Sequence, residues 1–189
     1  MTRSAALAIE EAVDRSNVIH VIQGESHVSA DPLALMTTVL GSCVAACLFD
    51  QRAGVGGMNH FLLPGDNGGD ENLRYGVHAM ELLINGLLRL GARRENLRAK
   101  LFGGARMVAG LSDIGAKNAA FANEFLAREG LVCVGGSLGG DHARRIQFWP
   151  TTGRARQIYP STAPRQVFET ELREKTAKPA ADSGDLELF

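Results

Sequence analysis

Hydrophobic residues along this chain recur with two different periods, and the change of period separates strand-like from helix-like segments. β-branched and apolar residues dominate residues 17–24, and the segments 44–50 and 57–63 carry the same strand-like pattern. The glycine-bearing sequence DQRAGVGG lies between the last two segments, which predicts a hairpin, and Pro64 ends the second of them. The first third of the chain is therefore expected to be mainly sheet.

Helical spacing of apolar residues appears further along the chain. A first helix is predicted over residues 75–90, with Gly91 as its stop, and a polar loop is predicted before it. A second helix is predicted over residues 113–128, capped by Asp113 and ended by Gly130. Two long helices thus follow the early strands.

The remaining strand-like sequences complete the predicted domain. LRAKLFGGARM and LVCVGGSLGG each run into paired glycines, whereas RRIQFWP and RARQIYP flank TTG as in a closing hairpin. This order predicts a compact single domain of the α/β class in an α+β layered arrangement, rather than a βαβ repeat. We expect residues 1–16 to form an N-terminal arm, 17–160 the domain, and 161–189 a disordered C-terminal tail.

Composition excludes several classes of function. The 189 residues include 20 Lys and Arg against 21 Asp and Glu, so no basic excess points to nucleic acid. No apolar run approaches the roughly 20 residues needed to cross a bilayer, and the acidic start is unlike a signal peptide. These features predict a cytoplasmic protein that neither binds nucleic acid nor inserts into a membrane. Its three cysteines form no CxxC pair and are expected to be reduced.

The stretch TTVLGSCVAAC contains the most reactive candidate. Gly41 and Ser42 weaken a strand without adding packing volume, so they indicate a bend that presents Cys43. A thiol becomes a nucleophile when a base takes its proton. The alternative is that Cys43 is simply a small buried hydrophobe, which is the favoured interpretation for Cys47 and Cys133.

His60, in GGMNHFLLP, is the predicted base. Pairing of segments 44–50 and 57–63 in a hairpin would bring it near Cys43, where an imidazole could accept the thiol proton. A third group usually orients such an imidazole, and hydroxyl or amide groups are available nearby. The neighbouring polar residues are Thr37, Thr38, Ser42 and Asn59.

Two other kinds of site are weaker predictions. Cys43, Cys47, His60 and Cys133 could supply enough ligands for zinc, but they lack paired-knuckle spacing. The glycine pairs match neither phosphate-binding pattern, so we interpret them as tight turns or as loops along the rim of a cleft. Gly41 would allow close approach of a substrate, with exposed N–H groups near the thiol stabilising an oxyanion.

Five motifs together resemble a known family. TTVLGSCVAACLFD, GGMNHFLLP, KLFGGARM, IGAKNAAF and GGDHARRI occur in this order between Val18 and Tyr159, as in the CheD family of chemoreceptor glutamine deamidases. The resemblance implies a layered α/β fold similar to the catalytic domain of deamidating toxins of the cytotoxic necrotising factor group. It also implies a cysteine amidohydrolase that needs no metal or organic cofactor.

The resemblance further implies substrates, partners and residue roles. Glutamines of methyl-accepting chemoreceptors would be converted to glutamate through a thioester, adjusting chemotactic adaptation, and a CheC-family phosphatase is an implied partner. Cys43 would be the nucleophile, His60 the base and Thr37 the third residue, with Thr38 one position away as the alternative. Gly41, Ser42 and Asn59 would contribute to the oxyanion or substrate site. The alternative functions are a regulatory module that binds the phosphatase and a different thiol hydrolase.

Overall fold

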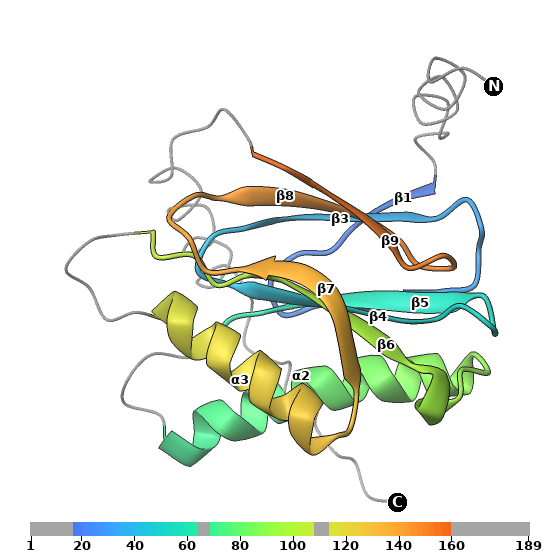
Figure 1. The fold of residues 1–189 in the computed structure, drawn as a ribbon, viewed down its shortest axis with the longest axis horizontal. Helices are drawn as coiled ribbons and strands as arrows, with labels where there is room; N and C mark the ends of the chain where they lie inside the picture. Colours follow the sequence, from blue (N-terminus) through green and yellow to red (C-terminus); the bar gives the residue numbers. More distant parts are fainter. Residues whose placement is uncertain (1–16, 64–68, 108–113, 160–189) are drawn as a thin grey trace, which may run out of the picture.

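The described part of the chain folds into two β-sheets and a layer of helices. The computed structural model describes residues 17–63, 69–107 and 114–159 (Figure 1). The four-stranded sheet contains, in order, β1 (Val18–His20), β3 (Leu35–Leu40), β8 (Arg144–Trp149) and β9 (Arg154–Ile158). The five-stranded sheet contains, in order, β2 (Ser26–Ser29), β5 (Val55–Phe61), β4 (Val44–Asp50), β6 (Arg98–Gly103) and β7 (Val132–Leu138).

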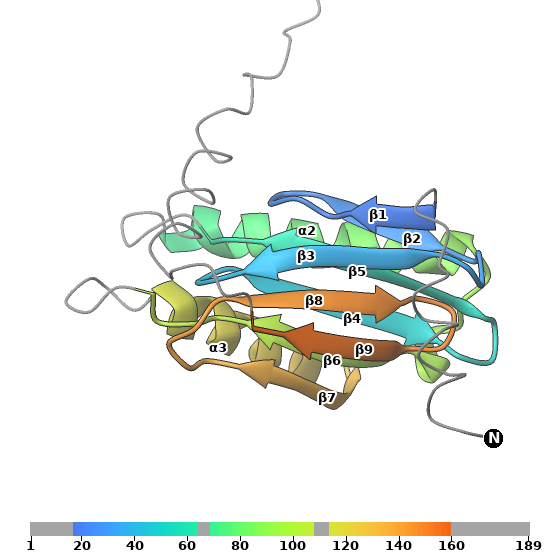
Figure 2. The same ribbon diagram turned by 90° about the horizontal axis from the view of Figure 1, so that it is seen from above.

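The helices cover one face of the five-stranded sheet, and the four-stranded sheet covers the other. Figure 1 shows α2 (Gly69–Arg89) and α3 (Ile114–Arg128) below the strands, and Figure 2 shows the four-stranded sheet lying across the five-stranded one. A short 3₁₀ turn, η2 (Arg94–Asn96), leads into β6. The predicted α/β layered domain with two main helices is confirmed, whereas its similarity to the necrotising-factor toxins stays a prediction.

Strand β4 lies at the centre of this arrangement because both of its faces are covered. All seven of its residues are buried, so its sequence VAACLFD is apolar up to the final Asp50. Successive side chains of a strand point to opposite faces. One face of β4 therefore contacts the helices and the other contacts the four-stranded sheet.

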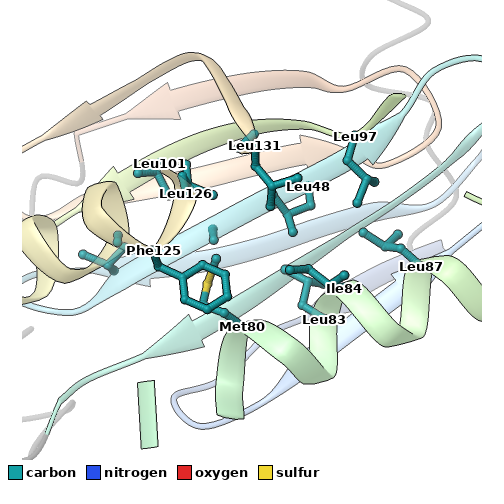
Figure 3. Close-up of a cluster of buried hydrophobic side chains, with 14 of the residues drawn as sticks. Leu48, Met80, Leu83, Ile84, Leu87, Leu97, Leu101, Phe125, Leu126 and Leu131 are labelled. Carbon is teal, nitrogen blue, oxygen red and sulfur yellow. The ribbon is translucent and has the colours of Figure 1, made fainter. Parts of the chain in front are cut away.

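Two separate hydrophobic cores result. The helix-side core, between the five-stranded sheet and the helices, includes Leu48 of β4 among large apolar side chains (Figure 3). Its members labelled in that figure are Leu48, Met80, Leu83, Ile84, Leu87, Leu97, Leu101, Phe125, Leu126 and Leu131. The inter-sheet core comprises Val21, Met36, Leu40, Cys43, Ala45, Cys47, Phe49, Met58, Phe102, Ile146 and Phe148. The second core is the one that contains the candidate nucleophile.

The predicted hairpin is confirmed, while one helix boundary is wrong. β4 and β5 pair antiparallel, with Val44 opposite Phe61 and Asp50 opposite Val55. Helix α2 begins at Gly69, six positions before the predicted start at residue 75. Apolar periodicity detects the buried side of a helix, so it misses a first turn whose sequence is mainly polar.

The glycine pair Gly56 and Gly57 is also not a turn, contrary to the prediction. Both residues lie inside β5. A Cβ atom at Gly56 would lie 2.1 Å from the Pro150 carbonyl oxygen, and one at Gly57 would lie 2.5 Å from that of His27. These glycines therefore allow close approach of neighbouring backbone.

The predicted N-terminal arm and C-terminal tail fall on residues 1–16 and 160–189, outside the described residues. Among the helices of the described segments, none has both the length and the apolar character needed to span a membrane.

Candidate active site

Cys43 lies in the bend between β3 and β4, directly before the first residue of β4. Its side chain is fully buried and belongs to the inter-sheet core. Cys43 shares its face of the strand with Ala45 and Cys47, in accordance with the period of two along a strand. The thiol is therefore held between the two sheets, beneath the bend.

Hydrogen bonds to three successive carbonyl groups fix the backbone of this bend. The N–H of Ala105 donates to the Gly41 oxygen at 2.8 Å, and the N–H of Gly104 donates to the Cys43 oxygen at 2.7 Å. The side-chain amide of Asn118 on α3 donates to the Ser42 oxygen at 3.2 Å. Because a trans peptide is planar, fixing each carbonyl also fixes the direction of the next N–H. The bend is thus a rigid frame for the thiol.

The two glycines of the motif KLFGGARM lie against the backbone of the Cys43 bend and of α3. Gly103 has a φ of 106°, and a Cβ atom there would lie 2.1 Å from the Cys43 carbonyl oxygen. Gly104 has a φ of 64°, and a Cβ atom there would lie 2.9 Å from the Gly115 oxygen on α3. Only glycine allows the end of β6 to pass this close to the Cys43 backbone.

His60 reaches the same region from β5. It lies opposite Ala45 in the β4–β5 register, so its side chain shares the inter-sheet face with Ala45 and Cys43. Cys43, two positions from Ala45, is its diagonal cross-strand neighbour. The His60 backbone donates to the Glu25 oxygen at 3.0 Å and accepts from the Gly24 N–H at 2.7 Å. The hairpin therefore places both predicted catalytic side chains on one face.

The hydroxyl that contacts His60 belongs to Thr38, not Thr37. Thr38 Oγ1 lies 2.9 Å from His60 Nδ1. Thr37 Oγ1 instead donates to the Ile146 carbonyl of β8 at 2.9 Å. Thr38 shares the inward face of β3 with Met36 and Leu40, whereas Thr37 points to the opposite face.

The imidazole is neutral at pH 7 in this environment. Burial lowers the pKa of His60 to about 4, against smaller raising effects from the Val21 carbonyl and Glu25. The Val21 oxygen lies 3.4 Å from Nδ1 and can only accept, which favours a proton on Nδ1. Nε2 then carries the lone pair. It is buried and has no hydrogen-bond partner within the described structure.

The thiol makes a contact that the sequence analysis missed. Cys43 Sγ donates to Gln23 Oε1 at 3.4 Å, and no hydrogen bond joins the sulfur to His60 Nε2. Gln23 lies in the turn after β1, and the adjacent Gly24 of the sequence QGE was its only local signal. Tyr75 of α2 is a second omission, because burial and then the nearby Cys43 raise the pKa of its phenol.

Asn59 is not brought to the thiol, although the sequence analysis predicted it as a substrate or oxyanion residue. Its amide Oδ1 accepts from the Ala46 N–H at 3.0 Å, and its Nδ2 donates to the Ala79 oxygen at 3.1 Å. These contacts lie on the helix side of the five-stranded sheet, since neighbouring residues of β5 face opposite ways. Gly41 and Ser42, by contrast, form the bend itself.

The residues considered for zinc do not gather. Among the side chains described, those of residues 17–63, 72–107 and 114–159, no three from His, Cys, Asp or Glu lie close enough to hold a metal ion. Cys133 is exposed on β7, at the edge of the five-stranded sheet, whereas Cys43 is buried between the sheets. Cys47 is also buried, and burial raises the pKa of its thiol strongly.

Comparison of the sequence with known proteins finds matches to one family. A family model described as CheD chemotactic sensory transduction matches residues 62–157. A protein of Caulobacter sp. strain K31 is 59% identical over 177 residues, which cover 90% of this chain and 92% of that protein. A protein of Caulobacter vibrioides strain NA1000 is 55% identical over 181 residues, covering 93% and 95%. Both relatives are named probable chemoreceptor glutamine deamidase CheD.

Solved structures give more distant likenesses. A Neisseria meningitidis protein of the family DUF152 aligns over 74% of this chain and 72% of its own, with 12% identity and a TM-score of 0.45. The Bacillus licheniformis hypothetical protein YfiH aligns over 70% and 67%, with 10% identity and a TM-score of 0.47.

Proposed function

The chain belongs to the CheD family of chemotactic sensory transduction proteins, and from this membership we propose that it is a cysteine-dependent protein-glutamine deamidase. Its substrates are glutamines in the cytoplasmic helical region of methyl-accepting chemoreceptors, and their conversion to glutamate adjusts adaptation. The observation that carries the proposal is the arrangement of Cys43 and His60 on one face, with Thr38 at 2.9 Å from His60 Nδ1. An imidazole with a hydroxyl at its Nδ1 thus lies on the same face as the thiol.

The first step transfers a proton and forms a bond. His60 Nε2 takes the thiol proton while the Cys43 sulfur attacks the side-chain carbonyl carbon of the receptor glutamine. Burial keeps His60 uncharged before this step, so its lone pair is available at neutral pH. The carbonyl electrons move to oxygen and form a tetrahedral oxyanion.

The oxyanion requires donors that are already in place. The N–H groups of Ser42 and Cys43 are proposed to contribute, supported by the hydrogen bonds that fix the carbonyls of Gly41 and Ser42, the residues before them. Donors fixed before the reaction stabilise developing charge without reorganisation. This role agrees with the Gly-Ser sequence that precedes the nucleophile.

Collapse of the oxyanion releases ammonia and leaves a thioester. Protonated His60 gives its proton to the departing nitrogen, and then takes a proton from water as the water attacks the thioester. Glutamate leaves as the C–S bond breaks, and protonated His60 returns its proton to the Cys43 sulfur, which restores the thiol. The protons given up by the thiol and by water all pass through His60, so no organic cofactor or metal is part of the proposal.

Thr38 is proposed as the residue that orients His60, in place of Thr37. Its hydroxyl at Nδ1, together with the Val21 carbonyl, favours the tautomer that has its lone pair on Nε2. Thr37 is supported only as a structural residue, since its hydroxyl bonds Ile146 of the neighbouring strand.

Location and a further partner complete the proposal. A receptor's cytoplasmic helices are accessible to a cytoplasmic enzyme, which is the location that we propose. A CheC-family phosphatase is proposed as a second binding partner, and the family resemblance is the support for it.

The test is direct measurement of deamidation. The full chain is incubated with a chemoreceptor cytoplasmic fragment, and each glutamine peptide is followed by mass spectrometry for a shift of about 1 Da, with ammonia release measured in parallel. We expect both signals in the wild type and neither in Cys43→Ala. Activity that survives this substitution would sink the mechanism. Full rescue of chemotaxis by Cys43→Ala would favour the regulatory binding module instead.

A further inference from the structure

The carboxamide of Gln23 contacts the Cys43 sulfur. Cys43 Sγ and Gln23 Oε1 lie 3.4 Å apart, with the thiol as donor. Gln23 is half-buried, whereas Cys43 is fully buried. A polar side chain thus extends from a turn into the inter-sheet core and reaches the atom that performs the chemistry.

The turn that carries Gln23 is attached to both strands that supply the histidine and its partner. The N–H of Val21 donates to the Thr37 oxygen of β3 at 2.9 Å, and the N–H of Gly24 donates to the His60 oxygen of β5 at 2.7 Å. Glu25 closes the turn by accepting from the Ile22 N–H at 3.2 Å. Gln23 therefore lies between two anchored neighbours, which holds its side chain in position relative to His60.

A carboxamide suits both states of the reacting sulfur. A neutral thiol donates, so it pairs with Oε1 as observed, but a thiolate can only accept. Rotation of the Gln23 amide by about half a turn exchanges Oε1 for Nε2, because the two ends have nearly the same shape. The same group that holds the resting thiol can then donate an N–H to negative charge.

We propose that Gln23 is a further catalytic residue, whose Nε2–H stabilises the negative charge that forms on Cys43 and then on the substrate oxygen. This inference rests on the proposed deamidase function. As His60 Nε2 takes the thiol proton, the electron pair left on sulfur is solvated by the Gln23 amide. When the S–C bond forms and the carbonyl π bond breaks, the charge moves to the oxygen next to the sulfur, within reach of the same N–H.

The arrangement also gives the unpartnered His60 Nε2 a purpose. A buried nitrogen without a hydrogen bond costs about 1–3 kcal/mol. The resting thiol proton points to Gln23, so Nε2 gains a partner only when the proton is transferred. Release of the thiol from Gln23 Oε1 and protonation of Nε2 are therefore parts of one step.

The main experiment compares Gln23→Ala and Gln23→Glu with a matched variant at Gln51, an exposed glutamine in the turn after β4. Loss of one oxyanion donor typically lowers kcat by about 100-fold or more, and we expect this for Gln23→Ala on a receptor fragment. Gln23→Glu is nearly isosteric but lacks the donor and adds a negative charge, so it should lose at least as much. Gln51→Glu should keep wild-type kcat.

A second readout does not depend on deamidation. In a Cys133→Ser background, which removes the exposed thiol, the rate of Cys43 alkylation by iodoacetamide is followed against pH. Gln23→Glu should move the midpoint of this profile to higher pH by about 1 unit or more, since a carboxylate disfavours a neighbouring thiolate. If wild-type protein fails to deamidate receptor while Gln23→Glu still raises the alkylation midpoint above that of wild type, the proposed function fails and the contact with sulfur stands.

Three results would overturn the role of Gln23. An unchanged kcat in Gln23→Ala would exclude a donor, and a raised kcat would make the residue a resting-state blocker instead. Conversion of Gln23 to glutamate in wild-type protein but not in Cys43→Ala, seen as a mass increase of the peptide, would make it a substrate of its own thiol. Circular dichroism of each variant checks that the fold is retained.

Discussion

The two hydrophobic cores of this molecule share one central strand but differ in what they contain. The helix-side core packs large apolar side chains, including Leu48 of β4, and the buried Asn59 amide beside it is fully used in hydrogen bonds to Ala46 and Ala79. The inter-sheet core includes two thiols, Cys43 and Cys47, and lies against the buried polar side chains of Thr38 and His60. Large apolar side chains stabilise the fold by burial, whereas buried polar groups cost free energy unless each is paired. One face of β4 therefore provides stability and the other holds the chemistry.

This division teaches that a site can be buried without resembling an ordinary core. Small residues on the inter-sheet face of β4, such as Ala45, leave room for the His60 imidazole opposite. The bend before β4 is held from outside, by Asn118 of α3 and the end of β6. Changes on the two faces should thus separate activity from stability.

The largest expected effect is loss of activity from the inter-sheet face. Cys43→Ala should reduce deamidation by about 10⁴-fold or more, because no other group can form the thioester. The free energy of unfolding should change by less than about 1.5 kcal/mol, since one sulfur atom is removed. Receptor deamidation and urea unfolding measure the two quantities.

Cys47→Ala is the matched control, because Cys47 lies four residues after Cys43 on the same face. It removes the same buried atom at a similar stability cost, but deamidation should stay within about twofold of wild type. Equal loss of activity in both variants would mean that the inter-sheet face acts only as packing.

The second effect is the reverse one, on the helix side. Leu48 is on the helix-facing side of β4 and is fully buried. Leu48→Ala should lower the free energy of unfolding by about 4 kcal/mol, because it leaves a cavity as well as losing burial. Deamidation per folded molecule should remain close to wild type when assayed in the absence of denaturant. A selective loss of kcat without destabilisation would contradict the division between the two faces.

The third effect is pH dependence, which should originate in the inter-sheet core. Burial lowers the pKa of His60 to about 4 from an ordinary 6.5. Above pH 6.5 the imidazole is neutral in both folded and unfolded chains, so its contribution to stability is complete. As the pH falls to about 4, only the unfolded chain takes up the proton, and the free energy of unfolding falls by roughly 3 kcal/mol.

Urea midpoints measured from pH 7 to pH 4 in wild type and His60→Gln isolate this contribution. As the pH falls, the free energy of unfolding of the wild type should drop relative to that of His60→Gln, because glutamine does not titrate. If the two curves stay parallel across this interval, protonation of His60 in the unfolded chain does not lower the free energy of unfolding, and the prediction is wrong.

Local signals in the sequence were enough for the hairpin but not for the details of the site. The turn between β4 and β5 and the apolar runs beside it predict their pairing, and with it the common face of Cys43 and His60. The period of two could have gone further. Asn59 is adjacent to His60 on one strand, so the two side chains cannot share a face.

The choice between the two threonines could also have been made from alternation. Met36 and Leu40 are the apolar positions of β3 that face the inter-sheet core, and Thr38 lies between them. The contacts of Gln23 could not be predicted in this way. They depend on β1 pairing with β3, and on a turn attached to β5, which no local pattern specifies.

The smallest expected effect is the one that tests this alternation. Thr38→Val keeps the shape of the side chain but removes the hydroxyl that lies 2.9 Å from His60 Nδ1. One hydrogen bond is worth about 1–1.5 kcal/mol, so kcat should fall by roughly tenfold. Because the imidazole would be less firmly held in one tautomer, the acidic limb of the kcat profile should also shift. Thr38→Ser should restore both the rate and the profile.

Thr37→Val is the control on the opposite face of the same strand. It removes a hydrogen bond to the Ile146 carbonyl, so the free energy of unfolding should fall by about 1 kcal/mol while kcat and its pH profile remain unchanged. If Thr37→Val lowers kcat and shifts the profile while Thr38→Val does not, the residue that orients His60 is Thr37. Thr38 would then serve only as a packing residue, and on β3 the residue important for chemistry would lie on the face away from the inter-sheet core, contrary to the division argued above.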